Sequence, residues 1–599
     1  MEHPPYRLAE QFDHFLGDPQ DPAETFSYAR CVELDEKEEF PADICRRLEE
    51  WGLADYYVPE EHGGRLRDYE QVLQLIRAVA RRDLTVAIGH GKTYLGGVCV
   101  WVAGTAEQAG RLGRDIRDGH PVSLGLTERA HGSDLLAGEV HSAPAPSGTS
   151  AGGRLVSGEK WLINNATRGT LISLLTRTDP AGGPRGFSVF LVDKRALPED
   201  SYRCLPKVRT HGIRGADISG IVFDEAPVGD DALVGAEGSG IETVLKALQL
   251  TRTMCASLSL GAADHGLALA TDFAERRELY GRRLIELPQA RQVLAAAAAD
   301  VALHEALALF ASRAVHTQTA ELGVTAAVTK YLLPSGTEQV LTDLTRVLGA
   351  RAFLKDVHAH GRFQKVERDH RIVGLFDGNT LVNLNSLVNQ FRSLVRGYRR
   401  GTGDVQGARA AYDLATPLEP LDPTKLSLVA RRGSGVQAGL AEHAAALARR
   451  AERQPALAAA AGAARRLVEA TTRVHDEMET QQHVVGDVEP EVFDTARRYA
   501  LCYAGAACLG LWTHSADHVT DGPTAPLWRD GLWLRAALDR ILFRLGEPDT
   551  GDDAAYEALL NHLRATRTHG EIYSLLPQRQ PGPRNAPGTS GTTGTTGKS

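Results

Sequence analysis

The sequence is poor in cysteine, and the few cysteines it has are scattered. Seven occur in 599 residues, at positions 31, 45, 99, 204, 255, 502 and 508, and no two form a Cys-x-x-Cys pair. An odd number of widely spaced cysteines fits neither a disulfide framework nor a zinc site. The first residues include acidic side chains and lack the apolar core of a secretion signal. We therefore expect a cytoplasmic protein with reduced thiols.

Positive charge and long apolar runs are also scarce. The chain has 67 Lys and Arg against 76 Asp and Glu, a formal net charge of −9. Without a basic excess, nucleic acid is not expected as a partner. The uncharged apolar run Tyr499–Trp512 is shorter than the ~20 residues that cross a bilayer, and it predicts a buried helix with no membrane span.

What the chain does contain is typical of a large globular protein. Apolar residues make up 43% and charged residues 24%, and at ~150 residues per domain the length allows about four domains. Apolar residues recur at three- and four-residue spacing in Phe40–Trp51, in Gln71–Arg82 and in Leu294–Ser312, which predicts amphipathic helices. The chain up to about residue 118 and most of the chain after about residue 238 are therefore expected to be helical.

Between these helical regions the pattern changes to short β-type runs. Each is rich in Val, Ile, Leu or Phe and is bounded by Gly, Pro or Asp; they are Val122–Leu126, Leu155–Ile163, Leu171–Thr178, Phe187–Val192 and Ile218–Phe223. Runs of this length with such turn residues predict a small antiparallel β domain.

The predicted fold class is α+β, mainly α. Prolines 417, 420 and 423 interrupt any helix in the middle of the chain, and the last residues are nearly all Gly, Pro, Thr, Ser and Arg. The predicted order is an N-terminal helical domain (1–118), a β domain (119–236), a helical bundle (237–400), a linker (401–425), a C-terminal helical extension (426–576) and a disordered tail (577–599).

The segment Leu124–Asp134 (LGLTERAHGSD) carries the first chemical signal. It begins as a strand and ends in a Gly-Ser-Asp turn. Small and hydroxyl residues at such a turn let a planar ligand approach the backbone, and Thr127 and Ser133 can hydrogen-bond it. Taken alone, the segment also fits an ordinary turn between strands.

This segment resembles the Thr-Glu-Pro-x-x-Gly-Ser-Asp motif of the acyl-CoA dehydrogenase family, with Arg129 in place of proline. Further resemblances to that family follow in its order, over roughly residues 40–395. They are Pro59–Gly64, Gly158–Asn165, Val234–Gly240, Leu248–Arg252, Arg277–Gly281 with Gln289, Leu348–Phe353, and Arg368-Asp369 followed by Phe376–Gly378. Each motif is weak, but their common order makes the resemblance strong.

The resemblance implies an FAD enzyme that converts an acyl thioester such as acyl-CoA to its 2,3-enoyl product. A carboxylate removes the α-proton while the flavin accepts the β-hydride. The family's base is a Glu that corresponds here to Asp377, one methylene shorter. Some members place the base on a helix at the position of Thr251, which cannot serve. Asp377 is therefore the candidate base, although an Asp before Gly is also common in plain turns.

The same resemblance implies the ligand-binding residues. Those expected to bind FAD are Leu126, Thr127, Ser133, Leu162, Asn164, Arg277, Gln289, Arg346, Gly349, Gly378 and Thr380. Ser133, Gln249 and Arg252 are expected to contact substrate. Arg277 matches an arginine that reaches the FAD of a neighbouring subunit, so a homo-oligomer is expected, with a dimer favoured by the added C-terminal helices. No metal is expected, because nothing near His358 and His360 completes a ligand set.

Several alternatives remain open at this stage. The chain could be a flavin oxidase acting on acyl-CoA or on another carbon acid, since nitroalkane oxidases share the fold and resemble this chain in having Asp as base. Its acyl group could be carried by an acyl carrier protein. Its electron acceptor could be an electron-transfer flavoprotein or O₂. It could also be a non-catalytic descendant, because Ala350 and Ala352 replace two glycines of the family motif.

Overall fold

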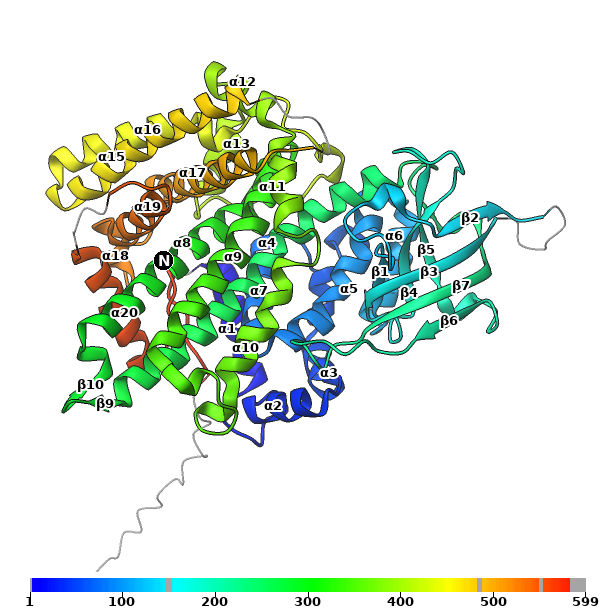
Figure 1. The fold of residues 1–599 in the computed structure, drawn as a ribbon, viewed down its shortest axis with the longest axis horizontal. Helices are drawn as coiled ribbons and strands as arrows, with labels where there is room; N and C mark the ends of the chain where they lie inside the picture. Colours follow the sequence, from blue (N-terminus) through cyan, green and yellow to red (C-terminus); the bar gives the residue numbers. More distant parts are fainter. Residues whose placement is uncertain (1–2, 147–152, 482–486, 549–552, 582–599) are drawn as a thin grey trace, which may run out of the picture.

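The computed structural model describes residues 3–146, 153–481, 487–548 and 553–581. A long bundle of helices lies beside a sheet domain, with the N-terminal helices between and beneath them (Figure 1). This confirms the predicted α+β class. The N-terminal helices are α1 (Pro4–Leu16), α2 (Tyr28–Lys37), α3 (Ala42–Trp51), α4 (Tyr69–Arg82), α5 (Leu84–Ala103) and α6 (Ala106–Arg117).

Asp83 separates α4 from α5. Its side chain accepts a hydrogen bond from the backbone N–H of Val86 and so caps the start of α5. Helix α5 is apolar nearly all round and is buried along most of its length. A helix of this kind belongs in the interior, and α5 packs against α4, α7 and β1.

The sheet domain is mainly antiparallel, with strand order β6-β7-β3-β2-β4-β5-β8. The strands are β1 (Val122–Gly125), β2 (His141–Pro144), β3 (Arg154–Asn164), β4 (Leu171–Arg177), β5 (Phe187–Asp193), β6 (Tyr202–Leu205), β7 (Ile218–Val228) and β8 (Leu233–Val234). Two pairings differ from the antiparallel expectation: β1 and β2 each run parallel to β4. The chain between β1 and β4 is long enough for the crossover that a parallel pair needs, and short apolar runs carry no signal of strand direction.

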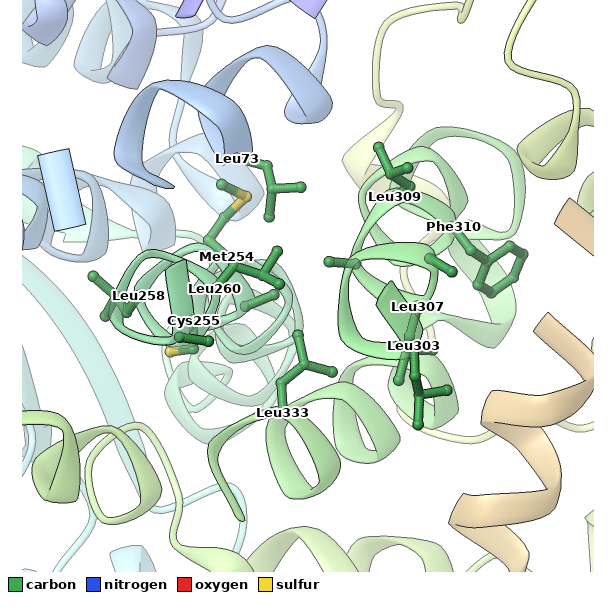
Figure 2. Close-up of a cluster of buried hydrophobic side chains, with 14 of the residues drawn as sticks. Leu73, Met254, Cys255, Leu258, Leu260, Leu303, Leu307, Leu309, Phe310 and Leu333 are labelled. Atoms are coloured by element: carbon green, nitrogen blue, oxygen red, sulfur yellow. The ribbon is translucent and has the colours of Figure 1, made fainter. Parts of the chain in front are cut away.

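The bundle comprises α7 (Gly240–Arg276), α8 (Pro288–Thr317), α9 (Leu322–Leu348), α10 (Arg362–His370), α11 (Thr380–Val388) and α12 (Phe391–Arg400). Leucines of α7, α8 and α9 interdigitate in its core (Figure 2). Among the described residues, α8 is the one helix long and apolar enough to cross a membrane, but 89% of its apolar window is buried inside the bundle.

The extension contains α14 (Gly435–Ala438), α15 (Leu440–Arg453), α16 (Ala458–Thr480), α17 (Pro490–Ser515), α18 (Ala525–Arg529), α19 (Leu532–Arg544) and α20 (Ala554–His569). It is not a separate body: α17, α19 and α20 pack on α8. The predicted linker 401–425 holds a further helix, α13 (Val405–Tyr412), which Asp404 caps and which also packs on α8. Of the predicted disordered tail, residues 582–599 lie outside the described part of the chain.

Asp300 of α8 is a buried charged link between the bundle and the extension. Its buried carboxylate accepts hydrogen bonds from Arg540 Nε at 2.9 Å and Nη2 at 2.8 Å, and it pairs with Arg544 at 2.9 Å, both on α19. These two guanidinium groups hold the pKa of Asp300 below its usual range against the effect of burial.

Replacing Asp300 with Asn should therefore destabilise the protein. The change leaves two partly buried guanidinium groups without their carboxylate, a loss of about 3–5 kcal/mol, and should lower the melting temperature by several degrees in a thermal scan. Glu557→Gln is the matched control, because Glu557 pairs with Arg291 of α8 at a half-exposed position, where an ion pair contributes under about 1 kcal/mol. Equal shifts in the two variants would contradict the role given to Asp300.

Candidate active site

Asp377 lies in the short loop between the 3₁₀ turn Arg371–Gly374 and α11. Asp377 has φ of 55° and Gly378 has φ of 91°, so two successive residues adopt the left-handed region, which Asp tolerates and Gly favours. The Arg252 Nε of α7 donates to the Asp377 carbonyl oxygen at 2.8 Å. A Cβ on Gly378 would lie 2.7 Å from Arg252 Nη2. The loop is thus fixed against α7, and only glycine fits beside the guanidinium.

The Asp377 carboxylate points inward, with 9% of its side chain exposed. Lys92 of α5 donates to both of its oxygens, at 3.1 and 3.3 Å from Nζ. The Cys255 thiol of α7 lies 3.7 Å from Oδ2, and the Lys92 ammonium also lies 3.7 Å from the centroid of the Phe376 ring. Residues from three elements therefore converge on one carboxylate.

A small cavity of about 60 Å³ adjoins this carboxylate. Its walls come from the 3₁₀ turn Leu53–Tyr57, from α4, α5 and α7 and from the Asp377 loop, and they are mainly apolar. The lining residues are Tyr57, Val72, Ile76, Ala87, Ile88, Gly91, Lys92, Tyr94, Leu95, Thr251, Met254, Cys255, Ser257, Leu258, Phe376 and Asp377.

Burial shapes the electrostatics of the groups around the cavity. It lowers the pKa of Arg252 and of Lys330, with Asp377 acting in the opposite direction on both. The Lys330 Nζ donates to the Val373 carbonyl at 2.6 Å. Burial, reinforced by the Asp377 charge, raises the pKa of the Cys255 thiol to about 12. Near neutral pH the thiol is therefore protonated and serves as a weak donor.

The residues expected to hold the flavin ring gather where β3 meets α5. The backbone N–H of Trp161 donates to the Thr127 carbonyl at 2.9 Å, which connects the Thr127 loop to β3. Asn165 Nδ2 donates to the Gly89 carbonyl of α5 at 2.9 Å, one helical turn from Lys92. Leu126 lies beside the same strand, because its carbonyl accepts a hydrogen bond from Lys160 Nζ of β3 at 3.0 Å. Ser133 is exposed in the following loop.

Two features at the end of β3 fit a planar ligand with polar edges. Trp161 and Ile163 pair with the adjacent Gly220 and Ser219, so Leu162 is the extra residue of a bulge. Leu162 has φ of 55° and is 41% exposed, which leaves an apolar side chain uncovered. The Asn164 Oδ1 is buried and has no hydrogen-bond partner among the described residues. An isoalloxazine ring would cover the leucine and offer the amide a donor.

The remaining FAD residues fall into a second, distant group. Arg277, Gln289, Arg346 and Gly349 are all exposed at the far end of the bundle. At 1.5 Å per residue, α7 separates Arg277 from Arg252 by roughly 37 Å. The two groups do not meet within one chain. Gly378 and Thr380, by contrast, lie in the Asp377 loop and at the first position of α11.

Gln249 contacts the extension. Its Nε2 donates to the Ser427 carbonyl at 2.9 Å, while its Oε1 is buried without a partner among the described residues. Sequence reasoning did not identify Lys92 or Cys255 as site residues. A lone lysine in the otherwise apolar stretch Leu84–Ala103 was the available signal for Lys92; a buried cysteine inside a helix gives none. The described residues contain no group of three or more His, Cys, Asp or Glu that could hold a metal, and His358 instead packs on the Phe273 ring.

Three protein-family models match successive segments of the chain. They are the N-terminal, middle and C-terminal domains of acyl-CoA dehydrogenase, over residues 20–120, 123–226 and 238–391. A probable acyl-CoA dehydrogenase of Mycobacterium tuberculosis is 25% identical over 63% of this chain and 94% of its own length. The human mitochondrial short-chain specific acyl-CoA dehydrogenase is 26% identical over 64% of this chain and 92% of its own.

One solved structure also covers the extension. The acyl-CoA dehydrogenase of Bacillus anthracis, complexed with FAD, superposes with a TM-score of 0.66 over 95% of both chains, at 17% identity. At that identity the likeness concerns the fold alone. It shows that the helices after residue 400 belong to an architecture found in another protein.

The environment of Cys255 makes a test of the site possible. With its pKa raised to about 12, the folded-state thiol carries almost no thiolate at pH 8, and the thiolate is the reactive form. Of the seven cysteines, all within the described residues, Cys204 is the one that is half-buried. Iodoacetamide at pH 8 should therefore label Cys204 in the native protein and leave Cys255 unmodified, as measured by peptide mass spectrometry. Labelling of Cys255 at the rate of Cys204 would show that the site is open.

Proposed function

The chain belongs to the acyl-CoA dehydrogenase family of FAD-dependent oxidoreductases that act on CH–CH groups, and we propose that Asp377 is the base that removes the α-proton of its acyl thioester. The observation that supports this best is the inward-facing carboxylate beside a cavity. A base must lie within hydrogen-bond reach of the proton it takes, and the cavity is the space beside this carboxylate for an acyl chain.

The local structure fixes the orientation of the shorter aspartate. Loss of one methylene costs about 1.5 Å of reach, a displacement that can lower a rate about a hundredfold. Here the left-handed turn at Asp377 and Gly378 and the Arg252 hydrogen bond fix the backbone. Lys92 fixes the carboxylate itself through both oxygens. The base is therefore held in one orientation before substrate binds.

We assign different binding roles to the residues around the cavity. Bound FAD supplies the acceptor for the β-hydride. The Leu126–Ser133 loop, Leu162 and Asn164 would hold its ring, and Gly378 and Thr380 lie on the Asp377 side. Arg252 orients the base loop, while the unpaired Gln249 Oε1 can accept an N–H from the arm that carries the thioester. That arm belongs to CoA or to a carrier protein, because both present the same amide-containing chain.

The distant group of FAD residues supports a homo-oligomer. Arg277, Gln289, Arg346 and Gly349 would serve an FAD bound by a second copy of the chain, since roughly 37 Å separates Arg277 from Arg252 of the same copy. Tyr280, which is 93% exposed, lies three residues after Arg277 in the same hairpin. Tyrosine is enriched at protein interfaces, which supports a contact at this hairpin. We propose a dimer built in part on this hairpin.

Replacing Asp377 with Asn tests the base. The variant keeps the size of the side chain but cannot accept the α-proton, so reduction of bound FAD by acyl-CoA under anaerobic conditions should slow by about 10²–10⁴-fold. The FAD absorption spectrum should be unchanged, which shows that the site is intact. Asp422→Asn, at a half-exposed carboxylate in a turn, is the control and should reduce FAD at the normal rate.

The same preparation separates the rival functions. Unchanged reduction in Asp377→Asn would overturn the base assignment. Rapid peroxide formation when the reduced enzyme meets air would identify an oxidase, whereas slow reoxidation accelerated by an electron-transfer flavoprotein would identify a dehydrogenase. Reduction by a nitroalkane but by no acyl thioester would replace the substrate class. A colourless protein that cannot be loaded with FAD would leave only the non-catalytic alternative.

A further inference from the structure

The Asp377 carboxylate, which lines the cavity together with Lys92, has more positive than negative charge around it. Lys92 is 9% exposed, Arg252 8% and Lys330 2%. The Asp377 carboxylate is the ion-pair partner of Lys92, and neither Arg252 nor Lys330 forms an ion pair with any described residue. The neighbouring Cys255 thiol is neutral, because its pKa is about 12. Three buried cations therefore face one carboxylate.

Two of these cations also have more N–H donors than hydrogen-bond acceptors among the described residues. Arg252 donates through Nε to the Asp377 carbonyl, and Lys330 donates to the Val373 carbonyl. No further acceptor is found for either among the described residues. An excess of one charge in a low-dielectric interior favours binding of the opposite charge.

Lys92 is the cation that belongs to the acyl side of the site. Its ammonium lines the cavity together with apolar residues of α4 and α5 such as Ile76 and Leu95. Apart from the two Asp377 oxygens, its neighbour is the face of Phe376, which attracts a cation but is a weaker acceptor than an oxygen. An anionic oxygen that enters the cavity can therefore take a donor from Lys92 without breaking a stronger bond.

The size of the cavity limits what can enter. A cavity needs roughly 10–15 Å³ of water-accessible volume to hold one water molecule. A cavity of about 60 Å³ therefore holds roughly four water-sized groups. This matches a few carbons with a compact end group and excludes a long fatty chain unless the walls move.

We propose that this cavity binds a short acyl group that ends in a carboxylate, which Lys92 recognises. The proposal rests on the function proposed above and names its substrate class. The ammonium pairs with the base and with the distal carboxylate of the substrate at once. Lys92 is thus a specificity-determining residue, and the substrate carboxylate supplies the negative charge that balances the excess of cations.

The experiment compares substrates matched in size and different in charge. Succinyl-CoA and 4-methylpentanoyl-CoA have the same number of heavy atoms in the acyl group, and dodecanoyl-CoA tests length. Anaerobic FAD reduction should show at least a tenfold higher kcat/KM for succinyl-CoA than for 4-methylpentanoyl-CoA, and no measurable reduction by dodecanoyl-CoA. The reverse order for the first pair would overturn the proposal while leaving the dehydrogenase function in place.

Variants of Lys92 separate recognition from positioning. Lys92→Met keeps the length of the side chain without charge and should lower or reverse the preference for succinyl-CoA, mainly through KM, whereas Lys92→Arg should keep it. If Lys92 only holds Asp377, Lys92→Met will slow both substrates by the same factor and the preference will persist, which refutes recognition. Failure of every acyl thioester to reduce bound FAD would instead refute the proposed function itself.

Binding without turnover gives a second measurement. A 3-thiaglutaryl thioester has sulfur in place of C3 and so has no β-hydrogen to transfer, and the 3-thiahexanoyl thioester is its neutral counterpart. Isothermal titration of the holoenzyme should show at least tenfold tighter binding of the anionic analogue, with the difference lost in Lys92→Met and kept in Arg529→Met, a change at an exposed arginine of α18. Equal affinities in the unmodified protein would overturn the proposal.

Discussion

The ion pair between Lys92 and Asp377 is the interaction on which the site depends. It joins an N-terminal helix to a loop 285 residues away in sequence, and it lies where α5, α7 and the start of α11 meet. The Asn165 side chain of the sheet domain also donates to the Gly89 carbonyl of α5, so the same helix fixes the cavity, the carboxylate proposed as the base and the edge expected to hold the flavin. Any shift of α5 would change all three together.

Other buried charges hold these helices in place. Arg77 of α4 donates to Asp264 of α7 and to Glu305 of α8 at 2.8–3.0 Å, and Lys365 of α10 joins Asp83, the residue between α4 and α5, to Asp369. Buried pairs add little net stability over apolar packing, but breaking one is costly. They therefore act mainly to set the register of the helices that carry Lys92, Arg252 and Asp377.

The extension completes the site as well as covering the bundle. Ser427, between the predicted linker and α14, accepts the hydrogen bond of Gln249, and Gln249 lies one turn before Arg252 on α7. Ala430 is likewise tied to Gln390 at the start of α12 through its N–H. The chain after residue 400 is thus in contact with the residues proposed to hold the thioester arm. In a protein without these helices, the buried Gln249 amide would have no partner from this side.

The sequence by itself determined the fold class, the order of helices and strands, and the loop that carries the proposed base, since periodicity and motifs such as Arg368–Gly378 are local in sequence. It could not determine the parallel pairings of β1 and β2, because apolar alternation carries no direction, nor the helix at Val405–Tyr412, which is stabilised by packing on α8. Only tertiary structure placed Lys92 against Asp377 and Gln249 against Ser427. Those facts depend on contacts between residues hundreds of positions apart, and no local pattern encodes them.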